Sequence, residues 1–180
     1  MQVGIVVHSQ TGHTVLLARA VADKLRKAGD EVDLHILRPR GKINPGSSRV
    51  ELGKVPDPLQ YDLLMIAGPV WAFNCSPAVS AYMETIEDNS LQNKPCLSFV
   101  TMGLPVHALN ANRALAVMDR KLARKGAQVL QGYALHWFIN ANKNALEMAA
   151  ETIASRVKGV RPAPEPPSVP PKPLEETQSE

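Results

Sequence analysis

The sequence lacks the features of membrane, secreted and nucleic-acid-binding proteins. No apolar run approaches the roughly 18 residues that a membrane span needs, and no basic segment precedes the apolar stretch at the start. The net charge is only +3, and no basic run is interleaved with aromatic residues. We therefore expect neither a membrane span nor a nucleic-acid partner.

Cysteine is scarce, with only Cys75 and Cys96 in the 180 residues. Their spacing matches neither the disulfide framework of a secreted protein nor a zinc site, so we expect reduced thiols, a cytoplasmic protein and no bound metal. Cys96 lies in an apolar run that predicts a core strand. Cys75 is more simply a small packed residue than a redox thiol, because no partner cysteine or base stands beside it.

The composition that remains is that of an ordinary globular domain, with 44% hydrophobic and 21% charged residues. We assign residues 1–158 to one domain. Residues 159–180 are rich in proline, which fixes the backbone and removes a donor, so this tail cannot build a core. We expect it to be extended or disordered; the alternative is that it lies along the body or a neighbouring subunit.

Within the domain, apolar β-rich runs alternate with helical patterns, which indicates parallel βαβ units in a three-layer α/β sandwich. The stretch 38–61 is broken by prolines and glycines and is expected to be a long connection without a clear helix. The second strand alternates apolar and polar residues, as a strand near an edge does. The expected strands are 3–7, 31–37, 63–67, 96–101 and 128–135, and the expected helices are 15–28, 77–87, 108–125 and 142–158.

Ligands bind such sheets at the carboxyl ends of the strands. The loop after the first strand is rich in hydroxyl and amide groups: Ser9, Gln10, Thr11, Gly12, His13 and Thr14. It lacks the glycine spacing of a dinucleotide fingerprint and the lysine of a triphosphate loop. Neutral donors at a helix N-terminus suit a terminal phosphate monoester held without a metal, although a plain helix start remains the alternative.

This loop resembles the phosphate-binding loop of the flavodoxin-like flavoproteins, which hold FMN. The loop after the third strand, residues 68–74 with Ser76 and Pro77 behind it, resembles the element that lines the isoalloxazine in flavodoxin-fold NAD(P)H:quinone reductases. The loop after the fourth strand lies where that family contacts the pyrimidine edge of the ring. The resemblance spans about residues 3–158 and implies a five-stranded parallel sheet of order 2-1-3-4-5.

The sequence departs from the family pattern in three places, the first being the lack of a clear second helix in residues 38–61. The second loop lacks the expected hydroxyl, because Gly68 directly precedes Pro69, and the Pro-rich tail has no counterpart. Trp71 supports a flavin site independently of the resemblance, because an isoalloxazine needs an apolar or aromatic wall. A Trp and a Phe two positions apart are unusual in a chain that is only 4% aromatic. The expected FMN contacts are the six residues of the first loop, then Pro69, Val70, Trp71, Ala72, Phe73 and Asn74, and finally Thr101, Met102 and Gly103.

Three histidine and tryptophan positions stay open. His107 follows the third loop and is a weak candidate to donate a proton to a substrate or to the reduced flavin. His136 and Trp137 follow the fifth strand, where they either border the same cleft or pack under the last helix. The sequence does not decide between these arrangements.

The resemblance implies an FMN-dependent oxidoreductase that takes hydride from a nicotinamide donor and reduces a quinone or a similar small acceptor. The alternative is a flavodoxin-type electron carrier between redox proteins, but the body lacks the acidic surface usual for one. A flavin-free regulator ranks last, because His8 and Ser9 stand where a magnesium-binding receiver needs acidic residues. Sharing of the flavin site between subunits is common among such reductases, so a homo-oligomer is an expectation.

Overall fold

The computed structural model describes residues 1–103, 108–137 and 143–160. The strands are β1 (Gln2–Val7), β2 (Glu31–Ile36), β3 (Leu63–Trp71), β4 (Asn74–Cys75), β5 (Pro95–Met102) and β6 (Gln128–His136). The helices are α1 (His13–Lys27), α2 (Pro77–Thr85), α3 (Ala108–Arg124) and α4 (Lys143–Val157), with 3₁₀ turns η1 (Pro58–Gln60) and η2 (Lys158–Val160). Each expected strand and helix is therefore present.

Five of the strands run parallel in the order β2-β1-β3-β5-β6, and the short β4 pairs antiparallel with β3. Because β4 lies off this path, the expected order 2-1-3-4-5 is confirmed. The second strand lies at an edge of the sheet, as its alternating pattern predicted. The carboxyl ends of the five parallel strands consequently share one edge.

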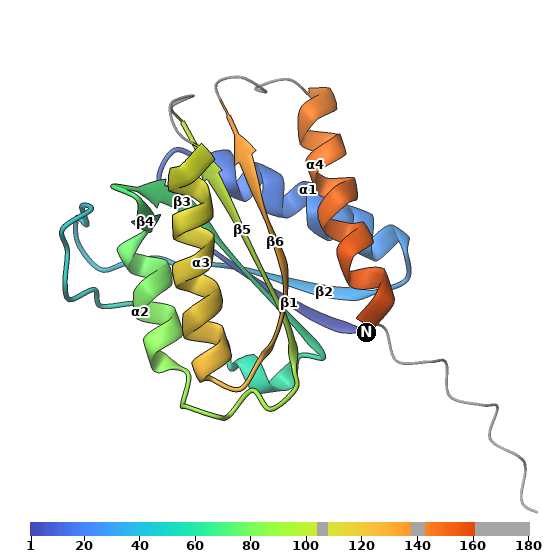
Figure 1. Ribbon diagram of the computed structural model, residues 1–180, viewed down its shortest axis with the longest axis horizontal. Coiled ribbons are helices and arrows are strands. Elements are labelled where there is room, and N and C mark those ends of the chain that lie inside the picture. Colours follow the sequence, from blue (N-terminus) through green and yellow to red (C-terminus); the bar gives the residue numbers. More distant parts are fainter. Residues whose placement is uncertain (104–107, 138–142, 161–180) are drawn as a thin grey trace, which may run out of the picture.

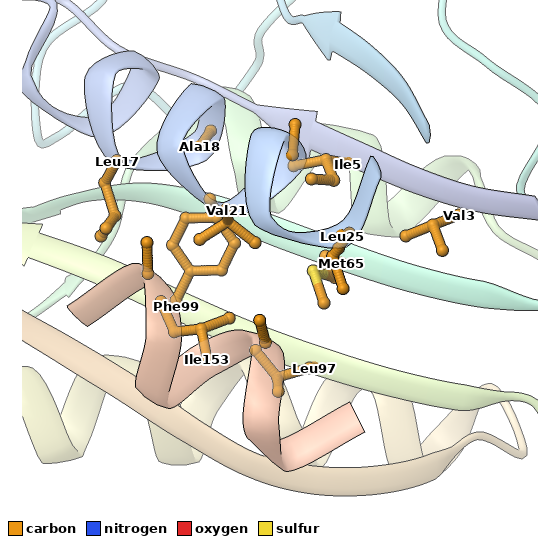
Figure 2. Close-up of a cluster of buried hydrophobic side chains, with 14 of the residues drawn as sticks. Val3, Ile5, Leu17, Ala18, Val21, Leu25, Met65, Leu97, Phe99 and Ile153 are labelled. Carbon is orange, nitrogen blue, oxygen red and sulfur yellow. The ribbon is translucent and has the colours of Figure 1, made fainter. Parts of the chain in front are cut away.

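The sheet is the middle of three layers, with α1 and α4 over one face and α2 and α3 over the other (Figure 1). Alternate strand residues feed the two cores, as the period of two requires. Ile5 and Phe99 pack with Leu17 and Ile153 on the first face (Figure 2). Neighbouring strand positions such as Val100 contribute to the second core instead. The three-layer prediction is confirmed.

The connection between β2 and β3 contains no α-helix, as its composition predicted. Its chain is held by an isolated bridge between Pro39 and Leu52 and ends in η1. Tyr61, 2% exposed, then packs in the second core, and its hydroxyl lies 2.7 Å from His35 Nε2. Burial, with nearby Asp33, raises the pKa of Tyr61 to about 12. A buried tyrosine thus contributes apolar surface where a second helix is missing.

The structure differs from the expectation mainly after the third strand. The expected strand ends at residue 67 and a loop follows, but β3 continues to Trp71 and returns as β4. Helix α2 ends at Thr85, slightly before the expected residue 87. The tail from residue 161 lies outside the described residues, so the domain boundary and the extended tail stay predictions. None of the described helices is long and apolar enough to cross a membrane.

Candidate functional site

The sheet register brings the three expected loops to one edge. Val7 pairs with Ala67 at the end of β1, and Pro69 pairs with Thr101 on β5. Met102 in turn pairs with His136 on β6. The loop at residues 9–14, the turn after β3 and the end of β5 therefore lie along the carboxyl edge of adjacent strands, where open α/β sheets bind ligands.

The loop at residues 9–14, called the phosphate loop below, ends in an open helix N-terminus. Gly12 is the N-cap of α1, with φ 88° and ψ −17°, and no side chain from the described residues caps the helix. A Cβ built on Gly12 would meet nothing within 4 Å among the described residues, so none of them packs against Gly12 on that side. The first-turn amides and the positive end of the helix dipole are available to an anion.

Two hydroxyls of the phosphate loop already have neighbours. Thr11 Oγ1 lies 3.2 Å from His13 Nδ1 at the surface. Thr14 Oγ1 lies 2.7 Å from Thr101 Oγ1, and both threonines are buried. In such a pair one hydroxyl donates to the other, which leaves one proton free for a further acceptor. The bond joins the first loop to the third, and the free proton belongs either to Thr14 or to Thr101.

The turn after β3 is a tight hairpin rather than the loop expected from the sequence. Val70 pairs with Cys75, and Trp71 pairs with Asn74. Only Ala72 and Phe73 lie between, with φ of 44° and 68°. Two-residue hairpin turns with positive φ at both positions normally use Asn and Gly, because L side chains cost about 1–2 kcal/mol each there. The surrounding structure must hold this turn.

The base of the hairpin is packed closely against α2. A Cβ built on Gly68 would lie 2.7 Å from Val79 Cγ2 and 3.3 Å from Ser76 Oγ. Ser76 is the N-cap of α2 and accepts a hydrogen bond from the Val79 amide at 3.5 Å. Glycine at position 68 therefore lets the hairpin meet the helix start, which gives a structural reason for the missing hydroxyl.

Trp71 faces a histidine that the sequence did not single out as a site residue. The rings of Trp71 and His8 meet edge to face, with centroids 5.6 Å apart and an angle of 87°. His8 Nδ1 lies 3.0 Å from Ser76 Oγ, and burial lowers the pKa of His8. The position of His8, immediately before the phosphate loop, was the only available signal. Phe73, at the hairpin tip, is 51% exposed.

The open question about Trp137 is answered by a second aromatic contact. Its ring stacks on His13 at 4.2 Å with an angle of 18°, and it also packs against the core under α1 and α4. Trp137 therefore borders the phosphate loop and also packs against the core that α1 and α4 cover. Within the described residues, His136 Nδ1 is buried without a hydrogen-bond partner.

The third loop contributes through Thr101 and the backbone. Met102 is buried in the second core, so its side chain is not a wall of the edge, and its carbonyl accepts from the Trp137 amide at 2.8 Å. Gly103 is exposed. Residues 104–107, including His107, lie outside the described residues, and the suggested role of His107 stays a prediction.

The cysteine predictions fit the structure. Both thiols are free and buried. Burial raises the pKa of Cys75, against smaller opposing effects of Lys121 and Ser80, and raises that of Cys96 to about 12. Both cysteines are therefore protonated core residues. The part of the chain that is described contains no group of three or more His, Cys, Asp or Glu side chains that would hold a metal ion.

A cavity of about 430 Å³ is lined by residues of β4, α2 and α3, and not by the phosphate loop. Asn74, Ser80 and Lys121 are among its lining residues. Lys121 bonds Ser80 at 2.7 Å and Glu84 at 2.5 Å, so its charge is matched there. This cluster joins α2 to α3.

No family model and no curated protein matches the chain. Solved structures do. A flavodoxin from Streptococcus pneumoniae TIGR4 shares 20% identity at a TM-score of 0.64, covering 89% of this chain and all of its own. A WrbA-like flavodoxin from Agrobacterium tumefaciens shares 16% at 0.64, covering 86% and 93%. A flavoprotein from Lactobacillus acidophilus NCFM, solved in complex with FMN, shares 15% at 0.57, covering 74% and 92%. The chain therefore has the flavodoxin fold.

Proposed function

We propose that this flavodoxin-fold chain binds FMN at the carboxyl edge of its sheet and acts as an NAD(P)H-dependent oxidoreductase on a quinone or a similar small acceptor. One observation carries the proposal. The uncapped start of α1, where no described residue lies within 4 Å of a Cβ built on Gly12, lies on the same edge as a hairpin that presents Trp71. Such an edge offers an anion site and an aromatic wall together.

The phosphate loop fits a phosphate monoester. Ser9, Thr11 and the Thr14–Thr101 pair supply hydroxyls, Gln10 supplies an amide, and the first turn of α1 supplies backbone N–H groups. All of these donors are uncharged, and the helix dipole adds its partial positive charge. The fit supports binding without a metal ion. In this role the chain positions the phosphate and fixes the direction in which the rest of the cofactor extends.

The hairpin and the third loop fit a flat, largely apolar ring with polar edges. Trp71, Val70 and Phe73 offer apolar surface, and the backbone around Asn74 and Gly103 offers hydrogen-bonding groups. When bound, FMN supplies the redox chemistry, and the protein supplies binding, orientation and shielding from water. No residue of the described chain is assigned to proton transfer.

The electron carrier remains the second candidate, because several structural neighbours are named flavodoxins. Charge favours the reductase. Residues 1–158 carry 18 Lys and Arg against 13 Asp and Glu, a formal charge of +5, whereas a carrier commonly uses an acidic surface to dock with redox partners. A cytoplasmic location and a homo-oligomer belong to the same proposal.

The test is to purify the chain, add FMN and record the visible spectrum, and then to follow oxidation of NADH and of NADPH with a soluble quinone. Binding with turnover is the expected result. Binding without turnover, with reduction in separate one-electron steps, would favour the carrier. A chain that leaves the FMN spectrum and emission unchanged would exclude both candidates.

A further inference from the structure

His8 occupies the junction between the two halves of the candidate site. It follows β1 directly, and the phosphate loop begins at the next residue. Its backbone N–H donates to the Ala67 carbonyl of β3 at 3.0 Å, and the residue is 4% exposed. It is thus a buried, titratable side chain that the proposed cofactor contacts do not use.

The imidazole contacts the hairpin and the start of α2 at the same time. Nδ1 lies 3.0 Å from Ser76 Oγ, and the ring stands at 87° to the indole of Trp71. Ser76 Oγ already accepts from the Val79 amide, so its own proton is free to donate to Nδ1. A neutral imidazole with its proton on Nε2 completes this arrangement, whereas a protonated ring has no acceptor to offer.

We propose that His8 is a positioning residue, whose neutral imidazole fixes the Trp71 hairpin relative to the phosphate loop. The placement of Trp71 is a property of the cofactor-free protein; only its consequence for FMN affinity rests on the proposed function. The strained turn at Ala72 and Phe73 explains why such a brace is needed, because local backbone preferences do not hold the hairpin in place.

The contacts of neutral His8 with Ser76 and Trp71 depend on pH in a defined direction. Burial lowers the pKa of His8 below 6.5, so the unfolded chain takes up this proton before the folded chain does. The stability due to neutral His8 is complete above pH 6.5 and is lost as the pH falls below it. The groups in contact with the ring, Ser76 and Trp71, carry no charge.

Two other titratable groups lie on elements that meet at this junction. His13, at the start of α1, bonds Thr11 and stacks on Trp137. The Cys75 thiol interacts instead with Ser80 and with the charge of Lys121. Since His13 contacts the second tryptophan, Trp137 must be replaced before the emission of Trp71 is read.

The experiment uses the full chain with Trp137→Phe, free of cofactor, so that Trp71 is the only tryptophan. Three versions are compared between pH 8 and pH 5: this parent, His8→Asn, and His8→Phe. Asn keeps an acceptor near the position of Nδ1 but does not titrate, and Phe keeps a ring but no acceptor. His35→Gln is the matched control, since His35 lies on β2 and bonds Tyr61.

We expect the Trp71 emission of the parent and of the His35→Gln control to change below pH 6.5. His8→Asn should keep the emission of the parent at pH 8 throughout, and His8→Phe should differ at every pH. With FMN at pH 8, Kd should rise about tenfold for His8→Phe, the loss of one buried hydrogen bond, and less than about twofold for His8→Asn.

Emission from the parent that does not change with pH, or His8→Asn that titrates as the parent does, would overturn the proposal. Equal Kd values for the parent and His8→Phe would overturn its consequence for the cofactor. If His8→Phe does not fold, the pH response of His8→Asn still decides. If no version binds FMN, the proposed function fails while the emission of Trp71 still tests the role of His8.

Discussion

The phosphate loop and the β3–β4 hairpin form one candidate site but hold their shapes for different reasons. The phosphate loop follows local preferences: Gly12 adopts φ 88° without strain, and the start of α1 supplies the donors. The hairpin opposes local preferences, because Ala72 and Phe73 both have positive φ. The loop is built by its own residues, whereas the hairpin depends on the packing beneath it.

The difference predicts how each half responds to substitution. A change in the phosphate loop removes donors and should alter ligand binding more than it alters stability. A change under the hairpin should alter stability, because Gly68 packs against the start of α2 and His8 contacts both Ser76 and Trp71. The four predictions below separate these outcomes.

The largest effect is expected in the phosphate loop. Replacing Thr11 and Thr14 together by Val should weaken FMN binding by about 2–4 kcal/mol, since the Thr11 donor is lost and the Thr14–Thr101 pair that would present a second donor is broken. Titration of the flavin emission measures it. The control is the pair Thr85→Val and Thr152→Val, whose hydroxyls bond carbonyls of their own helices. An unchanged affinity in the first pair would place the phosphate elsewhere.

Gly68→Ala tests the packing under the hairpin. The new methyl group would lie 2.7 Å from the fully buried Val79 side chain, so the free energy of unfolding should fall by about 1–3 kcal/mol. Urea denaturation of the cofactor-free protein measures the change. Gly159→Ala is the control, because a Cβ there meets nothing within 4 Å among the described residues. Equal stability of the two variants would show that the hairpin base yields readily.

Trp71→Ala should change the emission of bound FMN more than it changes the affinity for FMN. Loss of the indole should raise the emission of bound FMN and weaken its binding by about 1 kcal/mol. Trp137→Phe serves as the comparison, since it keeps an aromatic ring against His13. Emission that is the same in the Trp71→Ala variant and in the parent would remove Trp71 from the neighbourhood of the ring.

The smallest effect is a gain. Phe73→Gly relieves the positive φ of 68°, and the relief of about 1–2 kcal/mol exceeds the extra backbone entropy of glycine. The free energy of unfolding should therefore rise by about 0.5–1 kcal/mol in thermal or urea denaturation. Asn93→Gly, at φ 57°, should gain less, because asparagine tolerates this conformation better. A loss of stability at Phe73 would mean that its side chain, not its backbone, holds the tip.

Most of the fold could be predicted from the sequence because its signals are local. Apolar runs and helical spacing located the five parallel strands and four helices, and the prolines and glycines of residues 38–61 indicated a connection without a helix. The β4 strand was missed, since Ala72 and Phe73 are not turn residues by preference. Its existence depends on packing that no local pattern records.

The site was predicted unevenly for the same reason. Its three loops follow from strand ends and short motifs, and the register places them on one edge. The contacts that join them were not predictable. Thr14 meets Thr101, His8 meets Ser76, and His13 meets Trp137 across long separations in sequence.

The sequence by itself determined the layers and the neutral, hydroxyl-rich start of α1, because each depends on residues close together in the chain, and its resemblance to a family implied the strand order. Only the tertiary structure decided which donors are already paired, why position 68 is glycine, and what holds Trp71. These features depend on contacts between segments that are distant in sequence, and close packing, rather than local preference, selects their arrangement.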